Sequence, residues 1–142
     1  MSAQTRRKVL ALGGAAVVAG LAPHVGPARA GEVDARIAAF TGGAVIGGSG
    51  VTLSIAALVE NGVSVPIAFD APGAEAVLLL APANPDPQAA IFRFGPRAGS
   101  RSVATRVRLA ESQTVRVIAR FPDGRCAGAE AAVDVVVGGC VI

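Results

Sequence analysis

The sequence predicts an all-β domain, an antiparallel β-sandwich that is immunoglobulin-like in the broad sense. Seven short apolar stretches, alternating or continuous, follow one another at intervals of roughly ten residues. Gly, Pro, Asn and Asp residues, which favour turns, separate these stretches. No helical apolar period lies between them, which argues against a parallel β–α–β sheet. We therefore expect about seven strands, a short helix before them and a flexible Gly-Gly-Cys arm after them.

The first thirty residues are typical of an export signal. A basic segment, Thr5–Lys8, precedes an uncharged apolar run from Val9 to Leu21. Ala28-Arg29-Ala30 then supplies the small residues after which signal peptidase cuts. The apolar run is shorter than the roughly 20 residues that a membrane-spanning helix needs. We expect residues 1–30 to be cleaved, the β-sandwich to cover 31–137 and the arm to cover 138–142.

The adjacent Arg6 and Arg7 indicate which export route the signal uses. They resemble the arginine pair of twin-arginine signals, although Val9 stands where that family prefers phenylalanine. Proteins exported this way cross the membrane already folded. The expected location is therefore the periplasm, with no membrane association after the signal is cleaved.

Composition excludes several classes of function. The cleaved segment would carry Arg6, Arg7, Lys8 and Arg29 and no acid, which leaves 9 basic and 10 acidic residues and a net charge of −1. The high isoelectric point therefore gives no support for nucleic-acid binding. Beyond Ala30 the chain has no His, Lys, Tyr, Trp or Met, so the usual general bases and many metal ligands are missing. We expect no cofactor, no metal site and no enzymatic activity.

The expected helix covers Glu32–Phe40, where Val33, Ile37 and Phe40 share one face and cap one end of the core. A glycine-rich connector, 41–50, lacks the spacing of a nucleotide-binding loop and predicts a flexible lead-in. The seven strands are expected at 51–56, 63–69, 76–81, 89–94, 102–109, 114–121 and 129–137.

Turn residues and strand composition predict several details. Asn61-Gly62 and Asp123-Gly124 are hairpin signals. Pro66 cannot donate to a ladder, so its strand should have an edge or a bulge there. The continuous apolar run 76–81 predicts a central strand. The core should contain the five phenylalanines: Phe40, Phe69, Phe92, Phe94 and Phe121.

Four arginines of the expected strands 102–109 and 114–121 predict a polar surface. Arg106, Arg108, Arg116 and Arg120 could lie on one exposed sheet face. Such a face is usually solvated and paired with acids. The alternative is a patch that binds an acidic partner or an anion.

The two cysteines are not expected to pair. Cys126 begins the last strand and Cys140 follows its end, so the two lie roughly 40–45 Å apart along an extended chain. A disulfide needs Cα atoms within about 7 Å. Cys126 is then a small buried strand residue, and Cys140 is a free thiol whose pKa starts near the usual value of about 8.5, because no cation is close in sequence.

The C-terminal arm combines a stiff strand, a hinge and a nucleophile. The run Val133–Val137 is strand-forming, and Gly138 and Gly139 then release the backbone from strand geometry. Cys140 follows at once, near the chain end, where residues are commonly exposed. A thiol without its own base suits a carrier better than an enzyme, because a carrier needs access and reversible sulfur chemistry.

In these features the chain resembles the SoxY family, the carrier subunits of the periplasmic thiosulfate-oxidising Sox system. The resemblance covers almost the whole chain. It rests on the export signal and on a series of motifs in order: Phe40–Ala44, Glu60-Asn61-Gly62, Val65-Pro66, Asn84-Pro85 with Pro87, Ser102–Ala110, Ser112–Val115, Asp123-Gly124 and Val137–Cys140.

The resemblance implies a mechanism and a set of partners. The sandwich would pair with a SoxZ-like subunit, and Cys140 would carry the sulfur covalently, with Gly138 and Gly139 as its hinge. A c-type cytochrome enzyme would load thiosulfate on this cysteine. A dimetal thiosulfohydrolase would then release sulfate, and a molybdenum sulfane dehydrogenase would oxidise the remaining sulfur. Each of these cofactors belongs to a partner enzyme.

Two positions depart from the family pattern. The family tail normally reads Gly-Gly-Cys-Gly-Gly, whereas Val141 and Ile142 follow Cys140 here, and β-branched residues are stiffer. Cys126 stands where relatives commonly have an aromatic residue. An alternative therefore stays open: a divergent SoxY-like paralogue that acts as a non-catalytic binding or assembly domain.

Overall fold

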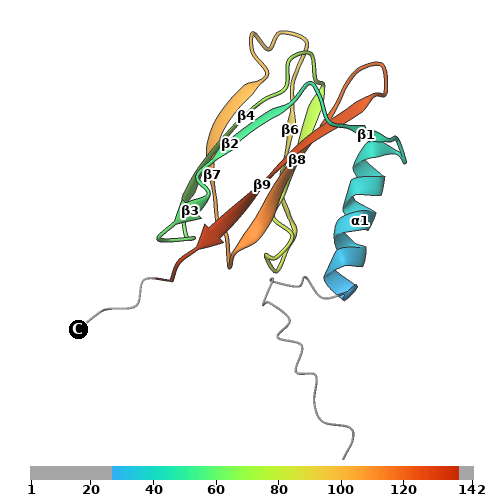
Figure 1. The fold of residues 1–142 in the computed structure, drawn as a ribbon. Coiled ribbons are helices and arrows are strands. Elements are labelled where there is room, and N and C mark those ends of the chain that lie inside the picture. Colours follow the sequence, from blue (N-terminus) through green and yellow to red (C-terminus); the bar gives the residue numbers. More distant parts are fainter. Residues whose placement is uncertain (1–26, 138–142) are drawn as a thin grey trace, which may run out of the picture.

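The computed structural model describes residues 27–137, which form one helix and nine strands (Figure 1). The helix α1 covers Pro27–Thr41. The strands are β1 (Ile46–Gly47), β2 (Thr52–Ile55), β3 (Leu58–Val59), β4 (Val65–Asp70), β5 (Ala76–Leu80), β6 (Gln88–Arg93), β7 (Ser102–Val107), β8 (Gln113–Arg120) and β9 (Cys126–Val135). In this part of the chain no helix is long and apolar enough to cross a membrane.

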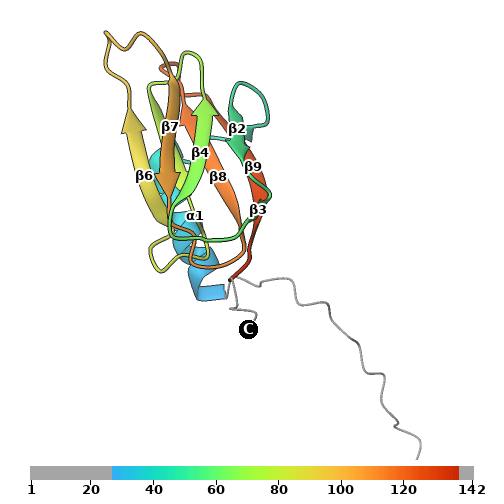
Figure 2. The ribbon, with the colours of Figure 1, turned by 90° about the vertical axis from the view of Figure 1, so that its left-hand side faces the viewer.

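The strands form two facing sheets and confirm the predicted sandwich. The larger sheet has the order β1-β9-β8-β5-β6, and β3 also pairs with β9. The smaller sheet has the order β2-β4-β7. Helix α1 packs on the outer face of the larger sheet, so the molecule has three layers (Figures 1 and 2).

Each of the seven predicted strands is present, and the long pairings are antiparallel as expected. Two strands were not predicted. β1 and β3 have only two residues each and pair with β9 in parallel. A strand of two residues is too short to show an alternating pattern, and both strands form only by pairing with β9. The expected flexible lead-in over 41–50 therefore contains a strand.

The two hairpin signals have different outcomes. Asp123-Gly124 joins β8 to β9 as predicted, and Gly124 has φ of +86°. Asn61-Gly62 does not form a tight hairpin, because residues 56–64 leave β2, run through β3 and only then enter β4. At Pro66, β4 pairs with β7 alone, since its pairing with β2 begins at Ile67. Pro66 thus sits at a local edge, as predicted.

Two apolar clusters replace the single predicted core. The larger lies between the sheets and contains Phe69 and Phe121, with Phe92 and Phe94 packed against it. The smaller lies under α1 and contains Phe40, Val33 and Cys126. The expectation that Phe40 shares the main core is therefore wrong.

Strand β5 explains why the run 76–81 is apolar throughout. Val77 and Leu79 belong to the cluster between the sheets, whereas Ala76, Leu78 and Leu80 belong to the cluster under α1. Both faces are buried, since side chains alternate between the faces of a strand. β5 lies between β6 and β8, which confirms the predicted central strand.

Helix α1 begins before its predicted start at Glu32. Among residues 29–41 the first buried side chain is that of Val33. The other end of the helix is held by Arg120, whose guanidinium donates to the Phe40 carbonyl at 2.9 Å and lies 5.0 Å from the Phe40 ring centroid. Before Val33, Arg29 donates to the Ala83 carbonyl at 3.1 Å.

The predicted alignment of four arginines on one sheet face is wrong. Arg106 lies on β7 of the smaller sheet, whereas Arg116 and Arg120 lie on β8 of the larger sheet. The last two form ion pairs, Arg116 with Glu130 at 3.0 Å and Arg120 with Glu75 at 2.6 Å. The alternation of polar and apolar residues shows which side chains share a face of one strand. It does not show that the consecutive strands β7 and β8 belong to different sheets.

Candidate functional site: the base of the C-terminal arm

The predicted carrier residue Cys140 and the predicted hinge residues Gly138 and Gly139 lie outside the described residues. The structure does describe the chain as far as Val137. It therefore shows how the sandwich holds the segment from which the arm continues, and which side chains surround that point.

The end of β9 is held from both sides. On one side, the backbone N–H groups of Asp134 and Val136 donate to the carbonyls of Ala57 and Val59, at 2.7 and 2.9 Å. On the other, the N–H of Val135 donates to Ser112 Oγ at 2.9 Å. These bonds position the backbone as far as Val136. The side chain of Val137 is 86% exposed.

Gly62 brings a loop against this end of β9. A Cβ atom at Gly62 would lie 2.1 Å from the Leu109 carbonyl oxygen and 3.1 Å from Val135 Cγ1. The Leu109 N–H donates to the Gly62 carbonyl at 2.7 Å. Only glycine allows this approach, so the Glu60-Asn61-Gly62 motif serves close packing at the arm base.

A network of side-chain amides fixes the neighbouring segment 108–110. Asn84 donates from Nδ2 to the Arg108 carbonyl at 2.7 Å, and its Oδ1 accepts from the Ala110 N–H at 2.9 Å. Gln113, which is only 6% exposed, donates to the same Oδ1 at 3.1 Å. Its Oε1 accepts from the Ala83 N–H at 3.0 Å. Two polar side chains thus hold the loop between β7 and β8.

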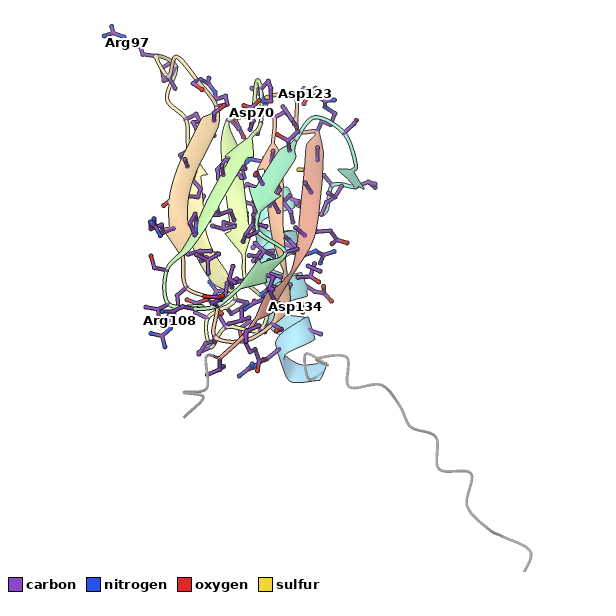
Figure 3. The ribbon with its side chains drawn as sticks, turned by 60° about the vertical axis from the view of Figure 1, so that its left-hand side comes forward. Asp70, Arg97, Arg108, Asp123 and Asp134 are labelled. Carbon is purple, nitrogen blue, oxygen red and sulfur yellow. The ribbon has the colours of Figure 1, made fainter. Side chains whose placement is uncertain are left out.

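These segments enclose a groove of about 390 Å³, which we call the arm-base groove. Its wall is formed by Glu60–Val63, Arg108–Ala110 and Val135–Val137. Three of its apolar side chains face solvent: Val63 is 64% exposed, Val136 46% and Val137 86%. Its charged residues are Glu60 and Arg108. Figure 3 shows Arg108 and Asp134 at the same end of the sandwich and Arg97 at the opposite end.

The chemistry available around the groove is limited. Between residues 27 and 137 no cluster of His, Cys, Asp or Glu could hold a metal ion. Cys126 is a free thiol, 1% exposed, in the cluster under α1. Burial raises its pKa, although the nearby Arg120 acts in the opposite direction. The prediction of a buried Cys126 is confirmed, and its raised pKa disfavours the reactive thiolate.

In the sequence, the residues that build the arm base belong to separate motifs. Gly62, Asn84 and Gln113 are far apart along the chain, and each looks like an ordinary turn or strand residue. The structure brings them together around Arg108–Ala110. Their order along the sequence carried no signal of this convergence, since it depends on three loops that meet at one end of the sandwich.

Comparison with known proteins identifies the family. The family model for the sulfur oxidation protein SoxY matches residues 37–140. The chain belongs to the SoxY family. It is also similar to the solved structure of the sulfur carrier protein SoxY from Chlorobium limicola f thiosulfatophilum, with 30% identity and a TM-score of 0.66 over 76% of this chain and 99% of that one.

More distant structures share the fold. A superoxide reductase (neelaredoxin) from Ignicoccus hospitalis aligns at 11% identity with a TM-score of 0.54, over 61% of this chain and 80% of that one. At this identity the likeness concerns architecture alone. A search of curated protein sequences gives no significant match.

The SoxY match covers the whole arm base and ends at Cys140. All the motifs that surround the arm-base groove therefore lie inside the region shared with the SoxY family, and so do Gly138 and Gly139. Val141 and Ile142 follow the matched region.

Proposed function

We propose that this chain is a periplasmic sulfur carrier that binds thiosulfate-derived sulfur covalently on Cys140 and presents it to the enzymes of sulfur oxidation. The observation that carries the proposal is the SoxY match, which runs through the anchored end of β9 to Cys140 itself. The solved relative at 30% identity is described as a sulfur carrier protein. Anchoring as far as Val136 gives such an arm a fixed base.

The loading step would join two sulfur atoms. The Cys140 thiolate and thiosulfate form R–S–S–SO₃⁻ and release two electrons, which a c-type cytochrome enzyme accepts. Hydrolysis by a dimetal enzyme then converts R–S–S–SO₃⁻ and water into R–S–S⁻, hydrogensulfate and a proton. The carrier supplies only a thiol that forms and breaks S–S bonds.

The composition of the chain supports the assignment of oxidation and hydrolysis to partner enzymes. The segment after Ala30 has no His or Lys, so it offers neither of the usual bases for hydrolysis. Electron acceptor, metal ions and molybdenum centre would all come from partner enzymes. A SoxZ-like subunit would complete the carrier as a heterodimer.

The test is the intact mass of the protein purified from cells grown on thiosulfate. We expect sulfonate and sulfane adducts on the wild-type chain and on Cys126→Ala, because Cys126 is buried, and none on Cys140→Ser. An unmodified wild-type thiol, together with normal growth of the Cys140→Ser strain on thiosulfate, would refute the proposal.

One observation favours a second function, a non-catalytic binding or assembly domain of a divergent paralogue. Val141 and Ile142 replace the usual two glycines, and these β-branched residues stiffen the outer part of the arm. This alternative predicts that removal of residues 138–142 leaves both partner binding and growth on thiosulfate unchanged. The carrier function predicts that growth is lost while partner binding is kept.

A further inference from the structure

We propose that Asn61 is a site of spontaneous deamidation, and that the isoaspartate formed there loosens the arm base as the protein ages. Asn61 belongs to the loop 60–63, in which Gly62 packs against Val135 of β9. The reaction consumes one water molecule and needs no enzyme, so it is independent of the carrier function proposed above.

Deamidation of an asparagine proceeds through a cyclic imide. The backbone nitrogen of the next residue, here Gly62, loses its proton and attacks Cγ of Asn61, and the new C–N bond expels the side-chain amide as ammonia. Water then opens the ring at either of its carbonyls, which gives aspartate or isoaspartate. In sum, the amide and water become a carboxylate and an ammonium ion, with no change of oxidation state. Glycine hinders this attack least, because it has no Cβ.

The turn from Asn61 to Val63 brings the reacting groups together. Asn61 is exposed, and its Oδ1 accepts a hydrogen bond from the Val63 N–H at 2.9 Å. A bond of this kind folds the asparagine side chain over the intervening peptide. Its Cγ atom is thus turned towards the Gly62 nitrogen. The Val63 N–H also stabilises the negative charge that develops on Oδ1 during the attack.

The Gly62 peptide is held in place, but its nitrogen is uncommitted. The Gly62 carbonyl accepts a hydrogen bond from the Leu109 N–H at 2.7 Å. Within residues 27–137 the Gly62 N–H donates to no acceptor. The nitrogen can therefore attack Asn61 without first breaking a hydrogen bond.

The other asparagine of the chain, Asn84, cannot react in this way. It precedes Pro85, whose backbone nitrogen carries no proton to lose. Its side-chain amide is also committed, since Nδ2 donates to the Arg108 carbonyl at 2.7 Å and Oδ1 accepts from the Ala110 N–H at 2.9 Å. Asn84 is thus an internal control for Asn61.

The Asp123-Gly124 turn resembles the Asn61 turn but lacks its free nitrogen. Oδ1 of Asp123 accepts a hydrogen bond from the Arg125 N–H at 2.9 Å, as Asn61 does from Val63. The Gly124 N–H, however, donates to the Phe121 carbonyl at 2.9 Å. An ionised carboxylate is also a poorer electrophile than an amide. The conditions for ring closure therefore meet at Asn61 and not at Asp123.

Isoaspartate at position 61 does not fit the arm base. It routes the backbone through the side chain and so adds one carbon atom, about 1.5 Å of chain, before Gly62. Gly62 has no room to move inwards, because even a Cβ atom there would overlap the Leu109 carbonyl oxygen and press on Val135 Cγ1. The loop must shift outwards, which weakens the bond from the Leu109 N–H. The new carboxylate also adds a negative charge beside Glu60, the acid that lines the arm-base groove.

The test is the site-resolved mass of the full chain after storage in mildly alkaline buffer made with oxygen-18 water. We expect the peptide that contains Asn61 to gain a labelled carboxylate, partly as isoaspartate, at least about tenfold faster than the peptide that contains Asn84. The rate should rise with pH, because the nitrogen attacks after it loses its proton.

The same measurement in guanidinium chloride shows what the fold contributes. Because the folded turn already holds the reacting groups together, the rate at Asn61 in the folded protein should lie within about threefold of the rate in the unfolded chain. A folded-state rate more than about tenfold lower would show that the loop protects Asn61, and the proposal would be wrong.

Matched variants separate the new backbone atom from the new charge. The hydroxyl of Asn61→Ser can still accept from the Val63 N–H, but it has no amide to lose. On storage this variant should keep its midpoint of thermal unfolding, whereas the wild type should lose about 5 °C, the shift expected for one lost hydrogen bond. Freshly purified Asn61→Asp carries the charge on an ordinary backbone and should unfold close to the fresh wild type. Aged wild type that contains isoaspartate but unfolds at the fresh midpoint would contradict the loosening of the arm base.

Discussion

The substitution Gly62→Ala tests the packing that positions the arm. The added Cβ would lie 2.1 Å from the Leu109 carbonyl oxygen, 3.1 Å from Val135 Cγ1 and 3.3 Å from the Leu109 carbonyl carbon. The nearest atom belongs to the backbone, so the 60–63 loop must move away. This movement lengthens or breaks the 2.7 Å bond from the Leu109 N–H to the Gly62 carbonyl.

The expected cost has two parts. Overpacking of this kind costs about 1–3 kcal/mol. The lost hydrogen bond adds about 1 kcal/mol. We therefore expect Gly62→Ala to lower the free energy of unfolding by about 2–4 kcal/mol. For a domain of this size the midpoint of thermal unfolding should fall by about 10 °C.

The assay is thermal and urea unfolding of Gly62→Ala beside Gly95→Ala. A Cβ atom at Gly95 would meet no other atom within 4 Å, and Gly95 has no positive φ, so alanine there should change the free energy of unfolding by less than about 0.5 kcal/mol. A Gly62→Ala protein as stable as Gly95→Ala would show that the loop does not press against β9, and the account of a fixed arm base would fail.

Three further predictions follow from other contacts. Gln113→Leu should cost about 1–3 kcal/mol in chemical unfolding, because it leaves the buried N–H of Ala83 without its acceptor. Burial raises the pKa of Cys126 above the usual thiol value of about 8.5, so its contribution to stability is complete below about pH 8.5 and is lost as pH rises through the folded-state pKa. The wild type should therefore lose more stability above pH 9 than Cys126→Ala does, in a chain without tyrosine; equal losses would contradict this. Replacement of Val141 and Ile142 by glycine should speed the loading of Cys140 in thiosulfate-grown cells, measured by intact mass; an unchanged rate would show that the β-branched tip is no obstacle.

Much of the fold could be predicted from local patterns. Alternation predicted the long strands, and Asp123-Gly124 predicted the turn before β9, because both signals reside in neighbouring residues. The two-residue strands β1 and β3 could not be predicted, since each depends on a partner far away in the sequence. The predicted place of Phe40 in the main core is wrong for a related reason. Phe40 packs against the outer face of the larger sheet because α1 lies there, and its own sequence does not show where the helix packs.

The candidate site also has a part that local sequence predicts and a part that depends on distant segments. The sequence alone predicted Cys140 and its glycine hinge, because a strand, two glycines and a thiol are contiguous. The structure adds the surroundings of the arm base, which arise from segments at 60–63, 84, 108–110 and 135–137. Among these segments, Glu60 and Arg108 are the charged residues that line the arm-base groove.

Helix α1 bears on the proposed export of this chain, which would include a cut after Ala30. A cut after Ala30 would remove about the first turn of α1, yet its buried side chains, Val33, Phe40 and Thr41, lie beyond that cut. Of the hydrogen bonds from its side chains, the cut would remove the one from Arg29 to Ala83. Precursor and mature protein should therefore have nearly the same stability. Under the proposed export, such a domain could complete its folding before transport, and removal of residues 1–30 afterwards would require no rearrangement of the sheets.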